Sequence, residues 1–353
     1  MRALVAALAP LPAVALGCLL FAVHGAPPAI LATQLVAVAL GLATCAALAR
    51  TQDLVRRGGA FVLLTTVALV AATLAAPGID DTHRWLRVGP LWMHAGAALE
   101  PSALVVLAVL WVEGSRALVL AGALVAGALH VAQPDAGQAT ALAAGLVMLA
   151  LVGERASARP ATEATEAKAA PVEATKVVPV EATKAAPVKA TKAAPVEATK
   201  AAPAPVDATA ATPLALFVAA ERRARRHRAL RALLALLGVG GLVAALARPD
   251  TVPPQPLVEG IVGRAALHGT EVAALAVAAL ALVPLGSAWL AQDRARTRAA
   301  RLAAACLAAY FVGALVAPLL GAYPVPWLGA GASPIVGGYA ALGLVVALGR
   351  ERG

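Results

Sequence analysis

The chain has 353 residues, of which 61% are hydrophobic and 14% charged, and its formal net charge is +10. A soluble domain usually contains about 25% charged residues, so this composition excludes an ordinary soluble globular protein. The positive charge does not indicate a nucleic-acid partner, because the arginines gather beside apolar runs, as membrane topology requires. We therefore expect a lipid bilayer, and no nucleic acid, as the surroundings of this chain.

Apolar runs of about 20 residues are long enough to cross the bilayer core as helices. The first run is retained as an uncleaved span, because no small-x-small cleavage pattern follows it. The sequence predicts an all-α, polytopic membrane protein with about ten spans: Ala3–Val23, Pro28–Ala49, Gly59–Ala76, Ala97–Val112, Ala117–Ala132, Gly137–Val152, Ala229–Ala247, Thr270–Leu290, Leu302–Ala322 and Pro334–Gly349.

The distribution of arginine predicts the orientation of these spans. Alternate loops are rich in arginine, and such loops remain on the cytoplasmic side. Both termini are then cytoplasmic, and the loops between them, which mix acidic and basic residues, face outward. Arginines of the predicted cytoplasmic loops include Arg50, Arg57, Arg116, Arg155, Arg222, Arg226, Arg294, Arg298 and Arg350.

A repeat interrupts the apolar pattern and divides the chain. The unit "AAPVEATK" recurs with a proline every eight residues, at Pro171, Pro179, Pro187, Pro195 and Pro203. Proline at this frequency prevents regular helix, and the composition is typical of a disordered linker. The predicted domains are an N-terminal membrane half, 1–153, a cytoplasmic linker, 154–213, and a C-terminal membrane half, 214–353. A basic helix, "ERRARRHRALRALL", leads into the second half.

Polar residues gather in four of the predicted outer segments, and polar groups at membrane depth commonly mark functional sites. In the first, "THRWLRVGPLW", Trp85 and Trp92 suit the membrane interface, whereas Arg84 and Arg87 can bind a phosphate. The second, "HVAQPDAGQAT", is either a capped tight turn or a functional one, with Asp135 as the cap.

The third segment, residues 248–269, is rich in proline and continues into a short amphipathic stretch. There, Glu259 and Arg264 form either a surface ion pair or part of a site. The fourth, "YPVPWLGAGASPIVGGYAALG", has small residues that allow close helix packing, and it can also form a re-entrant loop buried in protein.

Taken in this order, the four segments resemble the SEDS family of bacterial cell-wall polymerases (RodA, FtsW and SpoVE). "HRWLRVG" followed by "LEPSAL" is similar to the family's Arg-Trp pair, glycine and Gln-Pro-Ser-Glu motif. "QPDAG" matches the family's Gln-Pro-Asp-x-Gly turn fully, and "VEGIV" stands where the family has a Thr-Asp pair. "VPWLGAGASPIVGGYAALGL" is similar to the signature before the last span. The resemblance covers nearly the whole chain except the linker.

The chain departs from the family pattern at several positions. Glu100 replaces the glutamine of the Gln-Pro-Ser-Glu motif, Ala103 replaces its glutamate, and Val106 lies near the place of a lysine. Glu259 stands for an aspartate, and a downstream Glu-Glu pair is lost around Leu267 and His268.

The resemblance implies a peptidoglycan glycosyltransferase of the bacterial inner membrane that polymerises lipid II. Glu259 would be the catalytic base, and Arg84, Arg87 and Arg264 would bind the pyrophosphate. Glu100 and Asp135 would hold a divalent cation, Mg²⁺ or Mn²⁺, or else order the loop, and no other cofactor is expected. The expected partner is a class B penicillin-binding protein. Supporting residues are Trp85, Glu100, Ser102, Gln133, Asp135 and Ser333.

Two alternatives stay open at this point. The first is a SEDS-like protein that does not catalyse and instead serves a class B transpeptidase, and the replaced motif residues favour it. The second is a transporter or flippase of a lipid-linked substrate. A transporter predicts charged residues within spans and an internal repeat, and the sequence has few of the former and no visible sign of the latter.

Overall fold

The structure is a computed structural model that describes residues 1–78, 82–89, 91–153, 213–248, 255, 257–321 and 323–349. The chain divides into two compact units, residues 1–158 with 226–353 and residues 159–225. The first unit contains most of both predicted membrane halves, whereas residues 214–225 of the second half fall in the second unit. The predicted linker, apart from Pro213, lies outside the described residues, as do Asp80 and Asp81.

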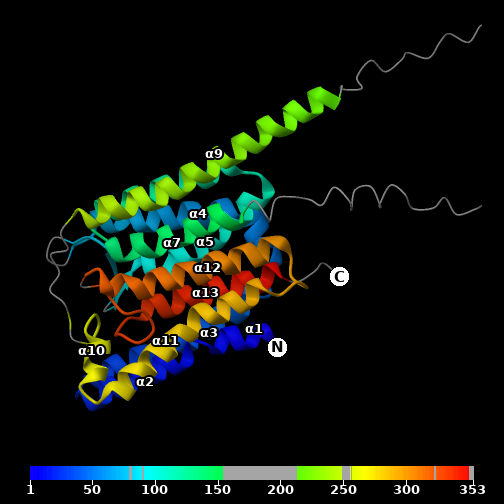
Figure 1. Ribbon diagram of the computed structural model, residues 1–353. Coiled ribbons are helices and arrows are strands. Elements are labelled where there is room, and N and C mark those ends of the chain that lie inside the picture. The colour runs from blue at the N-terminus through cyan, green and yellow to red at the C-terminus, as the bar shows by residue number, and fades with distance from the viewer. Residues whose placement is uncertain are drawn as a thin grey trace, which may run out of the picture. The chain divides into compact units, whose positions relative to one another are not determined.

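The described residues are mainly helical, as the sequence predicts (Figure 1). Among the described residues, seven helical segments are long and apolar enough to cross a membrane, and three shorter apolar helices accompany them. The helices, labelled as in Figure 1, are α1 (Arg2–Leu8), α2 (Leu11–Val23), α3 (Pro28–Leu48), α4 (Gln52–Ala72), α5 (Ala95–Glu113), α6 (Arg116–Ala132), α7 (Ala136–Val152), α9 (Pro213–Leu246), α10 (Ile261–Ala266), α11 (Thr270–Ala291), α12 (Arg298–Val316) and α13 (Ala332–Leu348). Two 3₁₀ turns, η1 (Thr73–Ala75) and η2 (Ala317–Leu319), extend α4 and α12. The chain is thus a multi-pass helical membrane protein.

Two helices differ from the predicted spans. The first span is broken into α1 and α2 at Pro10, because proline lacks the N–H that would continue the helical ladder. The basic segment and the seventh span form one helix, α9, of 34 residues.

The ends of the bundle differ in character. The N-terminus and the end of α13 lie at one end, together with the arginine-rich connections (Figure 1). We call this the inner end, after the orientation that the arginines predict. The opposite, outer end carries α10 and the four polar segments.

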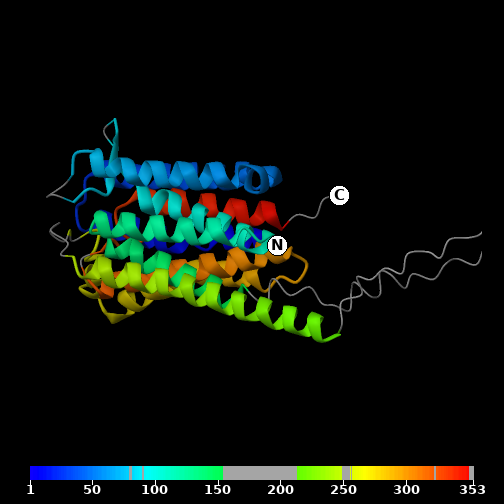
Figure 2. The same ribbon diagram turned by 90° about the horizontal axis from the view of Figure 1, so that it is seen from above.

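Helices α5, α7, α12 and α13 form the interior of the bundle, whereas α4 runs along one edge (Figure 2). Helix α5 contacts α4, α6, α7, α12 and α13, and most of its residues are buried. Leu104, Val105 and Val106 are completely buried there. Any residue at the outer end of α5 is therefore held in a rigid frame.

Small residues of α13 allow this close packing. Pro101 lies inside α5 and has no N–H, so the carbonyl of Ala97 lacks its usual helical partner. Gly337 of α13 lies against this carbonyl: a Cβ at Gly337 would overlap the Ala97 oxygen and lie 2.6 Å from the Ala98 oxygen. The predicted close packing before the last span is confirmed.

The outer segment that was predicted as a loop contains a β-hairpin, formed by β1 (Trp85–Val88) and β2 (Leu91–His94). The antiparallel register places Trp85 opposite His94 and Arg87 opposite Trp92. Side chains alternate between the faces of a strand, so these four residues share one face. The alternation in "WLRV" and "LWMH" is the sequence signal for these strands.

We predict that Gly337→Ala lowers the free energy of unfolding by about 1–3 kcal/mol, because the new methyl group meets backbone atoms of α5. Thermal or denaturant unfolding of the purified protein in detergent measures this. Gly240→Ala in α9 is the control, since no heavy atom lies within 4 Å of its Cβ position. Equal stability of the two variants would contradict the packing described here.

Candidate functional site

A cavity of about 440 Å³ opens at the outer end of the bundle. Its walls come from the β-hairpin, the starts of α5 and α7, the segment before α10, the end of α12 and the segment before α13. Most of the lining is apolar or aromatic, with a few polar groups, as is common in ligand sites. The predicted site residues among the lining are Trp85, Asp135, Glu259 and Ser333.

Asp135 joins several elements at the base of this cavity. It is the N-cap of α7, and its Oδ1 accepts a hydrogen bond from the backbone N–H of Gln138 at 3.1 Å. The same oxygen lies 3.9 Å from Arg84 Nη1, and Oδ2 lies 3.1 Å from His94 Nε2. The side chains of Asp135 and Arg84 are 2% and 3% exposed, so this ion pair is buried.

The pKa of Asp135, which lies in the turn between α6 and α7, is held well below its usual value. Burial alone would raise it, but interaction with His94, and then with Arg84 and His130, outweighs burial. Asp135 is therefore ionised and fully engaged, which favours the capping and ordering role over a role as proton acceptor.

His94 links the hairpin to both α5 and α13. Its Nδ1 accepts a hydrogen bond from Ala97 N at 3.2 Å, so the proton resides on Nε2, which faces Asp135. Its backbone N–H donates to Ser333 Oγ at 2.9 Å. Trp85 packs edge-on against the imidazole, with 5.9 Å between ring centroids. Ser333 thus anchors the start of α13 to the hairpin.

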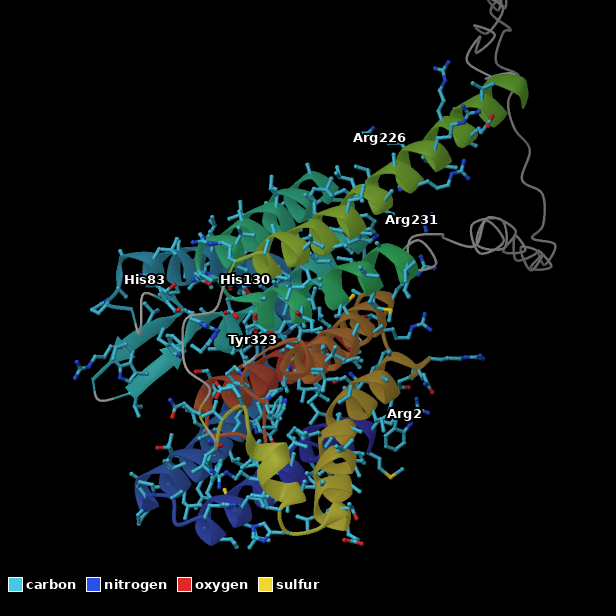
Figure 3. All side chains as sticks on the ribbon, turned by 60° about the vertical axis from the view of Figure 1, so that its left-hand side comes forward. Arg2, His83, His130, Arg226, Arg231 and Tyr323 are labelled. Atoms are coloured by element: carbon cyan, nitrogen blue, oxygen red, sulfur yellow. The ribbon has the colours of Figure 1, made fainter. Side chains whose placement is uncertain are left out.

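Glu100 and His130 form a second buried pair, between α5 and α6. His130 Nε2 contacts Glu100 Oε1 directly, and both side chains are almost completely buried. Figure 3 labels His130 among the helices beside the hairpin. Neither residue lines the cavity, so Glu100 supports the site from within the bundle.

Gln133 of the "QPDAG" turn has a structural role. Its Nε2 donates to Val70 O at 2.8 Å and lies 2.5 Å from Thr73 Oγ1. Thr73 Oγ1 in turn lies 2.8 Å from the carbonyl of His83, which precedes the hairpin. The turn is therefore tied to the end of α4 and to the hairpin.

Glu259 is partly buried, and hydrogen bonds fix the backbone of the segment that carries it. Its Oε2 accepts a hydrogen bond from Gln255 N at 2.5 Å. The preceding residues are bonded to the segment before α13: Val325 N donates to Val258 O at 3.2 Å, and Ala330 N to Leu257 O at 2.9 Å. This arrangement presents the carboxylate of Glu259 to the cavity.

The three arginines predicted to bind a diphosphate lie outside the described lining of the cavity. Arg84 is buried with Asp135, and its guanidinium lies 5.0 Å from the ring centroid of Trp85. Arg87 is exposed on the hairpin and stacks over Trp92 at 5.9 Å, and Arg264 is on α10. Their assignment to a diphosphate stays a prediction. Ser102 is partly exposed on α5 and also lies apart from the lining.

The described residues do not fit the divalent-cation hypothesis. They contain no group of three or more His, Cys, Asp or Glu side chains placed to bind a metal ion. Glu100 and Asp135 each face a histidine instead. A binding site for Mg²⁺ or Mn²⁺ therefore stays a prediction, with no ligand set among the residues that the structure describes.

Several residues of the site were missed by sequence reasoning. His94 and His130 interrupt otherwise apolar runs, which is the signal that could have found them. Tyr310 Oη donates to Gln138 Oε1 at 2.6 Å and lines the cavity from α12. Trp327 is buried between Phe311 and Tyr339, with ring centroids at 5.6 and 5.9 Å.

No known protein family matches the chain, and no curated protein is similar to it in sequence. Solved structures are similar in fold. The rod shape determining protein RodA of Thermus thermophilus superposes with a TM-score of 0.55 and 19% identity, over 97% of this chain and 94% of that one. A single-residue variant of that protein gives 0.57 and 18%, over 97% and 95%.

A third similar chain comes from a structure on the coordination of polymerization and crosslinking by a peptidoglycan synthase complex. Its TM-score is 0.55 with 18% identity, over 97% of this chain and 96% of that one. This chain therefore has the fold of RodA across nearly its whole length, and the fold that the SEDS resemblance predicts is confirmed.

We predict that Asp135→Asn lowers the free energy of unfolding by about 3–5 kcal/mol, because it leaves Arg84 buried without its counter-charge. Asp293→Asn is the control: Asp293 pairs with Arg2 and Arg296 in a partly exposed position, where such pairs contribute about 0–1 kcal/mol. Thermal unfolding in detergent compares the two variants. Similar losses would show that the Asp135 pair does not hold the outer end together.

We also predict a specific acid sensitivity. An unfolded aspartate has a pKa of about 3.9 and Asp135 in the fold has a lower one, so its ionisation stabilises the fold above that pH. This stabilisation is lost as the pH falls below about 4. The unfolding temperature, followed from pH 7 to pH 3, should fall less steeply in Asp135→Asn than in the unchanged protein. Equal slopes would contradict the linkage.

Proposed function

We propose that this chain is a SEDS-like protein of bacterial cell-wall synthesis that resides in the cytoplasmic membrane and polymerises lipid II. The observation that carries the proposal is Glu259, a carboxylate on a pinned backbone that lines the outer cavity of a RodA-like fold. The "QPDAG" turn, the motif of highest specificity in the sequence, lies at the base of the same cavity.

The cavity suits part of a glycan carried on a lipid. Its volume of about 440 Å³ lies in the range of small-molecule sites. Trp85, Trp92 and Trp327 line it, and aromatic faces bind the apolar faces of sugar rings. Polar groups also line it, among them Glu259, Asp135, His94, Gln138 and Ser333, and such groups can orient a polyhydroxyl substrate.

Glu259 is the better base of the two carboxylates that line the cavity. Both oxygens of Asp135 are engaged by Gln138, Arg84 and His94. Glu259 is partly exposed, and its Oε2 accepts a hydrogen bond from the backbone N–H of Gln255. Glu259 would take the proton of the acceptor hydroxyl while that oxygen bonds to the anomeric carbon of the donor.

The bond from the anomeric carbon to the phosphate oxygen breaks in the same step, and the lipid diphosphate leaves with the electron pair. General base catalysis of this kind contributes about 10²–10⁴-fold. Arg87, Arg84 and Arg264 are proposed to stabilise the diphosphate. Arg87 is the most accessible of the three, and it stacks on Trp92, a lining residue. The partner proposed for crosslinking the product is a class B penicillin-binding protein.

A second candidate function is a non-catalytic SEDS-like partner of such a transpeptidase. The observation that favours it lies in α5. Ala103 and Val106, which stand near the places of the family's glutamate and lysine, are buried apolar side chains of the core. Apolar side chains of the core therefore stand where the family has ionisable ones, and α5 carries no ionisable side chain at those two positions.

We expect Glu259→Gln to reduce glycan polymerisation at least about 100-fold, because the amide cannot accept the proton. Purified protein in liposomes, alone and with class B penicillin-binding proteins, would receive labelled lipid II, and products would be resolved on gels. Glu271→Gln, an exposed carboxylate of α11 outside the cavity, is the matched control and should retain activity.

Product from Glu259→Gln at the unchanged rate would disprove the base assignment. No product from the unchanged chain with any partner, but retained binding of lipid II, would establish the non-catalytic function. Unfolding temperatures of both variants show whether a loss of activity reflects a loss of fold.

A further inference from the structure

Gln138 presents an amide to the outer cavity, and the mechanism proposed above does not use it. It is the third residue of α7, is partly buried and lines the cavity. Its side-chain Oε1 accepts a hydrogen bond from Tyr310 Oη of α12 at 2.6 Å. Its stem lies against the start of α5, since a Cβ at Gly96 would lie 3.2 Å from Gln138 Cγ. The side chain is therefore held both along its stem and at its tip.

The contact with Tyr310 decides which way the amide faces. A glutamine amide has one acceptor oxygen and a nitrogen with two N–H donors. Tyr310 occupies the oxygen, and no residue that the structure describes accepts a hydrogen bond from Gln138 Nε2. The nitrogen is also not among the buried polar atoms that lack a partner, so it is accessible. Both N–H donors are thus available to a ligand in the cavity.

The charges around this amide favour a neutral acceptor over an anionic one. The described lining of the cavity contains the carboxylates of Asp135 and Glu259 and no Arg or Lys side chain. Arg84, which pairs with Asp135, lies outside that lining. No excess positive charge therefore faces the ligand, and a second anion in surroundings of low dielectric would be repelled. A neutral carbonyl or hydroxyl oxygen suits the amide of Gln138 better than a phosphate oxygen does.

Apolar groups lie beside the amide. Ala314 follows Tyr310 by one turn of α12 and lines the cavity. Tyr323, another lining residue, lies against α7 next to Gln138, because a Cβ at Gly137 would lie 3.0 Å from its ring. A methyl group attached to a carbonyl acceptor can be buried among such groups, whereas a hydroxyl has no methyl to bury. The two N–H donors and the apolar neighbours together match an acylamino group.

We propose that Gln138 determines specificity for a sugar ring that carries an acylamino group. Its Nε2 donates to the acyl carbonyl, and the acyl methyl packs toward Ala314 and Tyr323. Tyr310 is a positioning residue, because it orients the amide. This inference rests on the proposed function and deepens it, since it assigns the acylated ring of the substrate to the side of the cavity formed by α7 and α12. A donor left unpaired disfavours an analogue that lacks the acyl group.

Saturation-transfer difference NMR of the full chain in detergent tests the proposal, with di-N-acetylchitobiose and cellobiose as probes. The two disaccharides differ in having an acetamido group or a hydroxyl at the same ring position. The acetylated one should bind about fivefold more tightly, the typical effect of one net hydrogen bond. Its methyl protons should receive more saturation than its ring protons. Gln138→Glu keeps an acceptor for Tyr310 but removes both N–H donors, and it should abolish the preference. Gln138→Leu should do the same without adding a charge.

Gln292→Leu is the matched control and should retain the preference, because Gln292 is exposed and lies outside the lining of the outer cavity. Tyr310→Phe should reduce the preference, since the amide of Gln138 loses the bond that orients it. The ratio of the two affinities does not depend on the amount of folded protein. A purely structural effect of Tyr310→Phe would therefore leave that ratio unchanged.

A preference retained in both Gln138 variants would overturn the proposal. Equal binding of the two disaccharides by the unchanged chain, or binding of neither, would do so as well. The gel assay of lipid II polymerisation separates these results from a failure of the proposed function. Polymerisation together with equal disaccharide binding would leave the function standing and remove the role of Gln138. A preference that depends on Gln138, without polymerisation, would support the acylamino site and contradict the polymerase.

Discussion

The carboxylate of Asp135 is the interaction on which the outer end of this protein depends. This one side chain caps α7, faces the buried guanidinium of Arg84 and lies 3.1 Å from the imidazole Nε2 of His94. Each partner belongs to a different structural element, so the position of the hairpin relative to the helices follows from one carboxylate. A buried charge is costly unless its partners are complete. Asp135 has all its partners only when the hairpin, α5 and α7 are in place. The folding of these three elements is therefore coupled.

The same requirement explains why polar residues gather in so few places. Within a bilayer an unsatisfied polar group is costly, and helices satisfy their backbones internally. Side-chain polarity is therefore tolerated only where another element supplies the partner. Glu100 meets His130 across α5 and α6, Gln133 reaches the end of α4, and Tyr310 reaches Gln138. Together these contacts make a rigid base beneath an otherwise apolar cavity.

Environment separates the roles of the two carboxylates that border the cavity. Asp135 is buried, and its pKa is held low by His94 and Arg84, which suits a structural anchor. Glu259 lies on an irregular segment, but main-chain bonds to the loop before α13 fix that segment. Both groups are carboxylates, but Asp135 is buried whereas Glu259 is partly exposed. Such a difference in environment commonly separates a structural carboxylate from a reactive one. At the inner end, arginine side chains of α12 border a second cavity, so the two ends of α12 line different cavities.

The helices and the place of the polar segments could be predicted from the sequence, because apolar runs of membrane length and capping residues are local signals. Helices lie at all ten predicted spans, three of them as shorter apolar helices, and the small-residue packing of the last span and the capping role of Asp135 are confirmed. The hairpin was missed because four-residue strands give a weak periodic signal.

The partners of Glu100, Arg84 and Gln133 could not be predicted, because they depend on how the helices assemble. Each lies far away in sequence or on another element, and the burial that makes a charge pair obligatory arises only when the helices assemble. The packing therefore decides whether a charged side chain faces a cavity or an internal partner. Arg84, predicted to bind a diphosphate, faces Asp135 in the interior. Arg298 and Arg301, which the sequence indicated only as topology signals, border a cavity.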